Sequence, residues 1–387
     1  MWRAVALATP RLWQTLFLGF GGGVPKSKVK EEAVAMTHIW IKRSGALPLT
    51  LSLYVDEGTG QGRALAKALV NALYNYASRW EHVKFSYLRL SQHEHMPCLR
   101  TLSLWACERS TQFPFTSCPK LARIRWHLNA TVNSAPLPWH QLTHLYLDRP
   151  ASTRDMIFVI QSCPKLTVLE GTLQDEVQES LPREIVVHKS LRRLEIFVVQ
   201  TCNPLLKILT SPALTDIFIE IEYESAVTHG FQKELLGFFS RSKCKLNRMC
   251  LLNGGFDDEE LLECLKHNSC AALVDLRISE SSPYNSPMFT DPILLALTDM
   301  RPVENSLLLP NLARLSLESC LHGSPSRLGT MILSRCISRD KAVQLQRLNI
   351  ICLDLDERDI VLIQLAQIQG LEFSLNADDD EEYLSTW

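Results

Sequence analysis

The apolar residues of this chain follow one short pattern, apolar-x-x-apolar-x-apolar, which recurs along most of its length. Ten copies are clear, and they begin at Leu99, Leu121, Leu142, Leu166, Leu191, Leu214, Leu246, Leu273, Leu312 and Leu345. Two weaker copies flank them: Trp80, Val83 and Phe85 before, and Ile368, Leu371 and Phe373 after. The last two apolar positions of each copy are two residues apart, so on a β-strand they point to the same side. Each copy therefore predicts a strand with one buried face and one outward face.

The spacing of the copies is typical of a repeat protein. Successive copies begin between 19 residues apart (Trp80 to Leu99) and 39 residues apart (Leu273 to Leu312). These steps scatter around the period of roughly 20–29 residues that is typical of leucine-rich repeats. Amphipathic stretches lie between the copies, and we expect helices at 154–162, 205–210, 257–265, 292–298 and 356–367.

Together these features predict an α/β fold, a leucine-rich-repeat solenoid shaped as a curved horseshoe, with parallel strands on the concave face and helices on the convex face. An all-helical repeat does not fit, because apolar residues two apart do not share one helical face. The stretch at 257–265 begins with Asp257 and Glu260, three residues apart, as in a capping box. The alternating residues Leu49, Leu51 and Leu53 predict a capping strand before the repeats.

Composition and charge narrow the class of protein. Apolar residues make up 46% and charged residues 21% of the chain, as in an ordinary folded protein. The net charge of −2 offers no general attraction to nucleic acid or to an anionic membrane, so neither is expected as a partner. Pro10, Arg11 and Gln14 interrupt the apolar-rich stretch 1–24, which argues against a secretion signal. We therefore expect a soluble protein of the cytoplasm or nucleus.

The twelve cysteines support the same expectation. No two of them have the CxxC spacing of a zinc site, and no histidine pair with ligand spacing stands nearby. A disulfide framework is typical of short secreted chains. Buried free thiols are therefore expected, with no metal and no cofactor.

The polar positions of the predicted strands form the candidate binding face, because a curved array exposes such a face to a partner. We expect partner-binding residues at Trp105, Arg123, Arg125, His127, His144, Tyr146, Asp148, Glu170, Arg193, Glu195, Phe197, Phe218, Glu220, Arg248 and Arg277. Exposed aromatic residues and arginine are typical interface anchors, and charges of both signs favour a protein over a nucleic acid. We expect alanine at Trp105, Tyr146 and Phe218 together to abolish binding without loss of stability. The competing interpretation is that the charges only pair across neighbouring strands.

The N-terminal segment adds a family resemblance. Residues 2–13 read Trp-Arg-Ala-Val-Ala-Leu-Ala-Thr-Pro-Arg-Leu-Trp, and the segments 39–44, 48–53 and 79–83 follow, while Cys-Pro-Lys-Leu recurs at Cys118 and Cys163. In these segments the chain resembles fungal F-box proteins, particularly the mushroom type, in which the first segment is the last helix and exit turn of the F-box. The resemblance implies that Trp2, Leu7, Pro10, Leu12 and Trp13 belong to an F-box remnant.

In that family, the F-box docks on a Skp-type adaptor of a cullin ubiquitin ligase, and the repeats hold the protein to be ubiquitylated. The adaptor-binding part lies upstream of the Trp-Arg helix, so the resemblance implies that most of the F-box is missing here. A Skp-type adaptor would then be a partner only if the remaining helix, or another surface, still recruits it.

The expected organisation follows from these features. Residues 1–18 form the F-box remnant, 19–32 a linker, 33–78 an N-terminal capping strand and helix, 79–376 the repeat solenoid, and 377–387 an acidic tail. We expect the tail to be a solvated end, with the binding of basic partners as the alternative.

The predicted function is protein binding without catalysis, as in the substrate-recognition part of an F-box subunit of a ubiquitin ligase. The alternative is a free-standing repeat scaffold unrelated to ubiquitin. A hydrolase would need a deep polar pocket, whereas the pattern predicts an open face.

Overall fold

The computed structural model describes residues 2–20, 27–55, 60–85, 95–104, 117–127, 132, 137–174, 184–222, 230–280, 288–298, 307–337, 344–352 and 355–376. The chain forms two compact units, Met1–Thr172 and Leu173–Trp387. The predicted site residue Trp105 and the predicted acidic tail lie outside the described residues.

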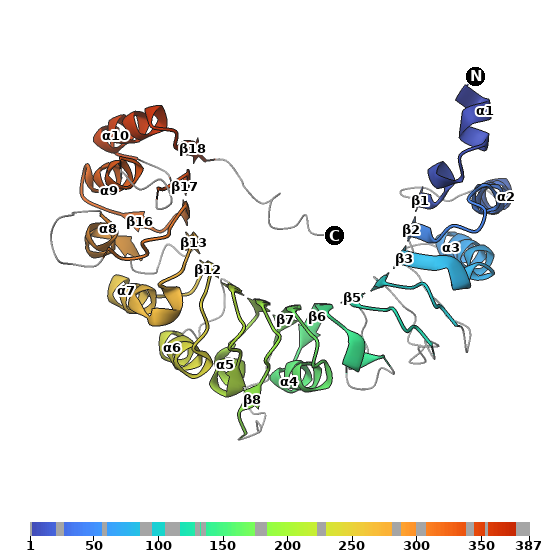
Figure 1. The fold of residues 1–387 in the computed structure, drawn as a ribbon, viewed down its shortest axis with the longest axis horizontal. Coiled ribbons are helices and arrows are strands. Elements are labelled where there is room, and N and C mark those ends of the chain that lie inside the picture. The colour runs from blue at the N-terminus through green and yellow to red at the C-terminus, as the bar shows by residue number, and fades with distance from the viewer. Residues whose placement is uncertain are drawn as a thin grey trace. The chain divides into compact units, whose positions relative to one another are not determined.

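Fourteen of the described strands belong to one sheet and follow each other in chain order. They are β1 (Thr15–Phe20), β2 (Leu49–Val55), β3 (Trp80–Phe85), β4 (Thr101–Leu104), β5 (Arg123–Trp126), β6 (His144–Ala151), β7 (Val168–Leu173), β9 (Arg193–Val198), β11 (Asp216–Ile221), β12 (Arg248–Leu252), β13 (Asp275–Ser279), β15 (Arg314–Glu318), β17 (Arg347–Ile351) and β18 (Glu372–Leu375) (Figure 1). Two short parallel pairs lie outside this sheet: β8 (Val186–Val187) with β10 (Leu209–Thr210), and β14 (Phe289–Thr290) with β16 (Leu321–His322). The large parallel sheet confirms the predicted α/β class, and every strand that the repeats and the capping segment predict is present.

Ten α-helices lie in the described parts of the chain. They are α1 (Trp2–Leu7), α2 (Ser27–Arg43), α3 (Gly60–Tyr74), α4 (Thr153–Ser162), α5 (Asn203–Ile208), α6 (Phe231–Ser242), α7 (Asp258–Lys266), α8 (Asp291–Leu297), α9 (Arg327–Cys336) and α10 (Glu357–Ile368). The five predicted helices correspond to α4, α5, α7, α8 and α10. At α7, the side chain of Asp257 accepts from the Glu260 backbone N–H at 2.8 Å, which confirms the capping box. In the second unit, successive helices from α5 to α10 pack side by side on one face of the strands (Figure 1).

The second apolar residue of each repeat forms a row across the strands. In the first unit, Val83 lies opposite Leu102, and Leu102 lies opposite Ile124. In the second unit, Leu194 lies opposite Ile217. All of these side chains are buried, because the two-residue period of a strand sends them to the face that packs against the helices.

The last repeat is displaced by two residues from its predicted position. Phe373 lies opposite Leu348, the second apolar residue of the preceding repeat. Phe373 and Leu375 therefore take the second and third positions that were predicted for Leu371 and Phe373. Ile368, the predicted first position, ends α10 and is 78% exposed. The alternating run from Leu371 to Leu375 fits the pattern in two registers, and only pairing with β17 selects one of them.

The N-terminal part of the chain differs from the predicted division. Strand β1 pairs with β2 from Thr15 opposite Thr50 to Phe20 opposite Val55. The segment predicted to be an F-box remnant, 1–18, thus extends into the sheet. Of the predicted linker, 19–32, residues 19 and 20 belong to β1 and residues 27–32 to α2. Alternation around the buried Leu16 gives β1 the period of a strand.

Gly171 occupies a third repeat position that is apolar elsewhere, and the packing explains why. A Cβ atom at this position would lie 2.5 Å from Cε of Met156 on α4 and 3.2 Å from Cβ of Leu147 on β6. Met156 is buried. The methionine side chain therefore fills the space that a larger residue occupies in the other repeats.

The last helices are joined by a buried arginine. Arg335 on α9 is 1% exposed. It donates hydrogen bonds to the carbonyl oxygens of Leu297 at 2.7 Å, Leu308 at 2.5 Å and Leu309 at 2.9 Å. Because Leu297 ends α8, the guanidinium satisfies a carbonyl that has no partner within its own helix.

A glycine and a buried carboxylate bring α9 and α10 together. The Asp359 carboxylate on α10 accepts a hydrogen bond from the Gly329 backbone N–H of α9 at 2.6 Å. A Cβ atom on Gly329 would lie only 2.6 Å from Cβ of Leu362, so the close approach of the helices depends on glycine. Burial raises the pKa of Asp359, and the hydrogen bonds from the Gly329 and Ser326 backbone oppose this effect.

Candidate protein-binding face

The outward face of the sheet carries rows of side chains that run across the strands. In the first row, Arg123 lies opposite His144 in the first unit, and Asp216 lies between Arg193 and Arg248 in the second. The middle row consists of the single residue that stands between the second and the third apolar position of each repeat. In Figure 1 the helices α2 to α4 of the first unit and α5 to α10 of the second lie on the other face of the strands. Parallel sheets are usually covered on both faces, so this open polar face is the candidate site.

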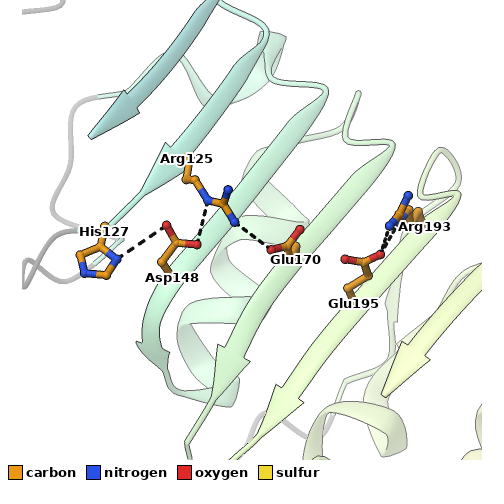
Figure 2. A network of polar contacts seen from close by, with 6 residues as sticks. All are labelled: Arg125, His127, Asp148, Glu170, Arg193 and Glu195. Atoms are coloured by element: carbon orange, nitrogen blue, oxygen red, sulfur yellow. Dashed lines mark hydrogen bonds and ion pairs between the residues drawn. The ribbon is translucent and has the colours of Figure 1, made fainter. Parts of the chain in front are cut away.

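In the first unit, strands β5 to β7 carry a connected cluster centred on Arg125 (Figure 2). Its Nε lies 2.9 Å from Oδ1 of Asp148, and its Nη2 lies 3.2 Å from Oε1 of Glu170. The guanidinium also lies 5.5 Å from the centre of the Tyr146 ring, within the range of a cation–π contact. Nδ1 of His127 is 3.7 Å from Oδ2 of Asp148. The two carboxylates therefore neutralise Arg125 and orient it on the face.

In the second unit, the arginines of the first row all have a carboxylate partner. The pairs are Arg193 with Glu195, Arg248 with Asp216 at 3.4 Å, Arg314 with Asp275 at 3.2 Å, and Arg347 with Glu372 at 3.1 Å. In the middle row, the buried Arg277 lies 3.5 Å from Glu318. The more exposed of these pairs, Arg248 with Asp216 and Arg347 with Glu372, contribute only about 0–1 kcal/mol each. The charges thus pair within the sheet, as the competing interpretation expects, and their role in partner binding stays a prediction.

The predicted aromatic anchors are less exposed than expected. Tyr146 is only 6% exposed, because the Arg125 guanidinium packs over its ring. Alanine at Tyr146 would remove a buried ring, so we now expect the variant with alanine at Trp105, Tyr146 and Phe218 to lose stability as well as contacts, and thermal unfolding measures this. Phe197 and Phe218 are half-buried, and their ring centres lie 5.4 Å apart across β9 and β11.

The remaining predicted residues within the described part of the chain lie on the outward face. Arg123 and Arg248 are exposed, and His127, His144, Asp148, Glu170, Arg193, Glu195 and Glu220 are half-buried. Burial lowers the pKa of His144, and the nearby Arg123 charge lowers it further. His144 is therefore neutral at neutral pH and adds no charge beside Arg123.

Two exposed aromatic residues of the same face were not predicted. Phe17 on β1 is 71% exposed and Tyr54 on β2 is 59% exposed. Phe17 lies opposite Ser52, and Tyr54 lies opposite Gly19. Phe17 was not predicted because residues 15–18 were assigned to the F-box remnant. The alternation around Leu16 and the pairing with the capping strand are the signals that would have identified it.

The predicted remnant residues lie around α1 and the 3-10 helix Pro10–Trp13. Trp2 is 84% exposed, and Leu7, Pro10 and Leu12 are exposed as well. Trp13 is different, because its ring packs against Trp40 of α2 with centres 4.6 Å apart. The Arg43 guanidinium lies 4.5 Å from the centre of the same ring, and the Trp13 indole N–H donates to the carbonyl of Ala6 at 2.7 Å. Trp13 thus anchors the N-terminal segment to α2.

Other kinds of site have no counterpart in the part of the chain that the structure describes. It holds no group of three or more histidine, cysteine, aspartate or glutamate side chains placed to bind a metal ion. None of its helices is both long enough and apolar enough to span a lipid bilayer.

No model of a known protein family matches the sequence, and a comparison with curated proteins finds no similar one.

Proposed function

We propose that this chain is a leucine-rich-repeat solenoid, curved into a horseshoe, whose outward strand face binds another protein without catalysing a reaction. The observation that carries this proposal is the open face of a parallel sheet, lined with ordered charges and aromatic residues. A soluble protein seldom leaves such a face uncovered unless it has a ligand. The alternating charges favour a protein partner, because a nucleic acid would require a predominantly basic surface.

We further propose that the partner is a protein to be ubiquitylated, and that this chain corresponds to the substrate-recognition part of an F-box subunit. The support is the resemblance of residues 2–13 and of the segments that follow it. Exposed apolar side chains in this segment, including Trp2, Leu7 and Leu12, provide a surface for a further contact. The free cysteines, most of them buried, fit a reducing compartment such as the cytoplasm or nucleus.

Direct binding to the Skp-type adaptor of the host tests the ubiquitin-ligase part of the proposal. Because the resemblance implies that most of the F-box is missing, adaptor binding would depend on the remaining helix or on another surface. Micromolar or tighter binding of the full chain in calorimetry and co-purification would support the ubiquitin-ligase part, and the double variant Trp2→Ala/Leu12→Ala should then weaken it. The control is Val361→Ala/Leu365→Ala, two exposed apolar residues on α10. Absence of adaptor binding would overturn the ubiquitin-ligase assignment and leave a free-standing binding protein.

The binding face itself is tested in the second unit. The double variant Phe197→Ala/Phe218→Ala removes the aromatic pair of β9 and β11. We expect it to weaken capture of the cellular partner by about tenfold or more, as for central interface aromatics. The matched control is Leu295→Ala, an exposed apolar residue on α8. Equal capture by both variants would contradict the assignment of this face.

A further inference from the structure

In the described part of the chain, the large sheet has two open edges, β1 and β18, because each of these strands pairs with a single neighbour. In a parallel ladder, alternate residues of a strand turn their backbone N–H and C=O groups to one neighbour, and the residues between them turn theirs to the other side. On the β1 side, the carbonyl of Gln14 accepts a hydrogen bond from the Thr50 N–H of β2 at 2.9 Å. Every second residue from Gln14 therefore points to β2, and the backbone groups of Phe17 and Gly19 point away from the sheet.

The backbone of β18 follows the same alternation. The N–H groups of Glu372 and Asn376 donate to carbonyl oxygens on the β17 side, both at 2.8 Å, so the backbone groups of Phe373 and Leu375 point away from β17. No strand among the described residues pairs with these groups, and an unpaired edge is a template for a further strand. The edge strand β1 also lacks the charged side chains and prolines that usually protect an edge.

The two edges complete each other when they are placed side by side in parallel. In one register, the Phe17 N–H donates to the carbonyl of Phe373, and the Leu375 N–H donates to the carbonyl of Phe17. The same register places Leu16 beside Phe373 and Leu18 beside Leu375. The apolar rows that cross the sheet would therefore continue from β18 of one copy into β1 of another, as they do between neighbouring repeats.

The apolar core is open at the β18 edge. Leu375 is 43% exposed, whereas Ile350, the residue opposite it on β17, is fully buried. Helix α10 exposes Val361, Leu365 and Ile368, at 55%, 46% and 78%. Spacings of four and three residues place these side chains on one face of the helix. The terminal repeats of a solenoid normally present a polar outer face, so this apolar end has the chemistry of a surface between repeats.

The β1 edge supplies a matching apolar surface. In the last repeats a helix precedes each strand, α9 before β17 and α10 before β18, and the two helices pack together. The segment before β1 consists of α1 and the 3-10 helix Pro10–Trp13, and Trp13 packs on Trp40 of α2. This segment therefore begins the row of helices in the first unit. It exposes Leu7 at 43% and Leu12 at 58%, in the place where the apolar face of α10 from another copy would pack.

The charges of the two edges are opposite, and they select which edges meet. Residues 1–43 carry seven lysines and arginines and two acids, a net charge of +5, whereas residues 354–387 carry ten acids and one arginine, a net charge of −9. Arg3 and Arg11, before β1, are exposed and pair with no carboxylate of the described residues. Two β1 edges, or two β18 edges, would repel each other, whereas a β18 edge attracts a β1 edge.

We propose that the β18 edge of one copy of this chain stacks on the β1 edge of a second copy, so that the parallel sheet and its row of helices continue from copy to copy. The contact joins two different surfaces, so it adds further copies until a ring closes. This inference goes beyond the proposed function, because it uses the edges of the sheet and leaves the outward face free. Leu12 also belongs to the surface proposed for the adaptor, so the variants that test the stacking leave it unchanged.

Sedimentation velocity of the full chain over a range of concentrations measures the association. We expect the wild type to form species larger than a monomer as its concentration rises. Phe17→Pro blocks the β1 edge by removing an outward N–H that the pairing with β2 does not use, and Gly19→Pro is a second variant of the same kind. Ile368→Lys/Leu375→Lys blocks the β18 edge with two cations. We expect each block to weaken association by about tenfold or more.

The matched control for the lysine variant is Leu295→Lys/Ile337→Lys, which changes two exposed apolar residues away from both edges and should associate like the wild type. Thermal unfolding of every variant checks that it is folded. A wild type that stays monomeric, or edge variants that associate as strongly as the control, would overturn the inference.

An equal mixture of a β1-blocked and a β18-blocked variant distinguishes stacking of unlike edges from a symmetric pairing. Each variant keeps one intact edge, and the two intact edges are complementary. We therefore expect a dimer and no larger species in the mixture, at concentrations where each variant alone stays monomeric. A mixture that stays monomeric, or a variant with one blocked edge that forms dimers alone, would contradict the head-to-tail contact.

The dependence on salt tests the charge argument. We expect association to weaken by about tenfold or more between about 0.05 M and about 0.5 M salt, because the Debye length falls over this range. Changing the five acids of residues 378–382 to amides should weaken association at low salt and reduce its salt dependence. Association that neither salt nor this variant alters would refute the choice of opposite edges by charge. None of these results affects capture of a partner through Phe197 and Phe218, which tests the proposed function separately.

Discussion

Replacing Arg335 by methionine would remove the guanidinium and keep most of the aliphatic stem. The buried side chain donates to the carbonyl oxygens of Leu297, Leu308 and Leu309 at 2.5–2.9 Å. Each buried carbonyl that loses its partner costs about 1–3 kcal/mol. The gross loss is therefore about 3–9 kcal/mol, and it is offset because methionine avoids the several kcal/mol needed to desolvate a charge. We expect the variant to lose about 3–5 kcal/mol of unfolding free energy, at the upper end for a single substitution.

The control is Arg327→Met, an exposed arginine at the start of the same helix, α9. A surface change of this kind is expected to alter stability by about 0.5 kcal/mol or less. Arg335→Lys should fall between the two, because an ammonium can donate to the carbonyls but lacks the planar geometry that reaches all three.

Urea denaturation, followed by tryptophan fluorescence, measures the overall change. A repeat array need not unfold in one step, so native-state hydrogen exchange should accompany it. We expect amides in α8 and α9 to lose protection in Arg335→Met while strands of the first unit keep theirs. If Arg335→Met and Arg327→Met differ by less than about 1 kcal/mol, the three carbonyls do not depend on the guanidinium and the reasoning is refuted.

Three further predictions concern packing and titration. In the native chain, thiol reagents should label the partly exposed Cys98 and Cys352 before the buried described cysteines, because burial blocks access and, at Cys163 for example, raises the thiol pKa to about 12; equal labelling rates measured by mass spectrometry would contradict this. Gly171→Ala should cost about 1–3 kcal/mol, and the double variant with Met156→Ala should cost less than the sum of the single changes in urea denaturation, since the new methyl group clashes with that side chain. The raised pKa of Asp359 means that its proton is held more tightly in the folded state, so stability relative to Asp359→Asn should fall as the pH rises from about 4 through the folded-state pKa; a difference that increases with pH would contradict the assigned burial effect.

Much of the fold could be predicted because its signal is local. The two-residue period of the repeats places Leu102, Ile124 and Leu194 in the core of their strands, and a strand alternates its side chains whatever its neighbours are. The capping box at Asp257 was predictable for the same reason, since all of its atoms lie within one helical turn. The displaced last repeat was not, because Phe373 finds its register only against Leu348 of the strand before it.

The candidate site was predicted less well than the fold. The strand period predicted which residues lie on the outward face, and the predicted residues within the described part of the chain lie on that face. Tyr146 is less exposed than the period suggests, because its ring is covered by Arg125 from the neighbouring strand. Phe17 was not predicted, because a short strand beside a glycine-rich stretch has too few repeats of its period to stand out.

The sequence by itself determined the strands, the order of their apolar residues and the side to which each residue points, because these follow from the backbone period over a few residues. Only the tertiary structure decided which charges pair, which aromatic side chains remain exposed and why Gly171 and Arg335 occupy their positions. Those properties depend on contacts with residues that are often 20 or more positions away in the chain, such as Arg125 with Glu170 and Arg335 with Leu297. A local pattern carries no information about which side chain a neighbouring repeat supplies at such a contact. These contacts between strands determine which charges and aromatic rings the outward face presents.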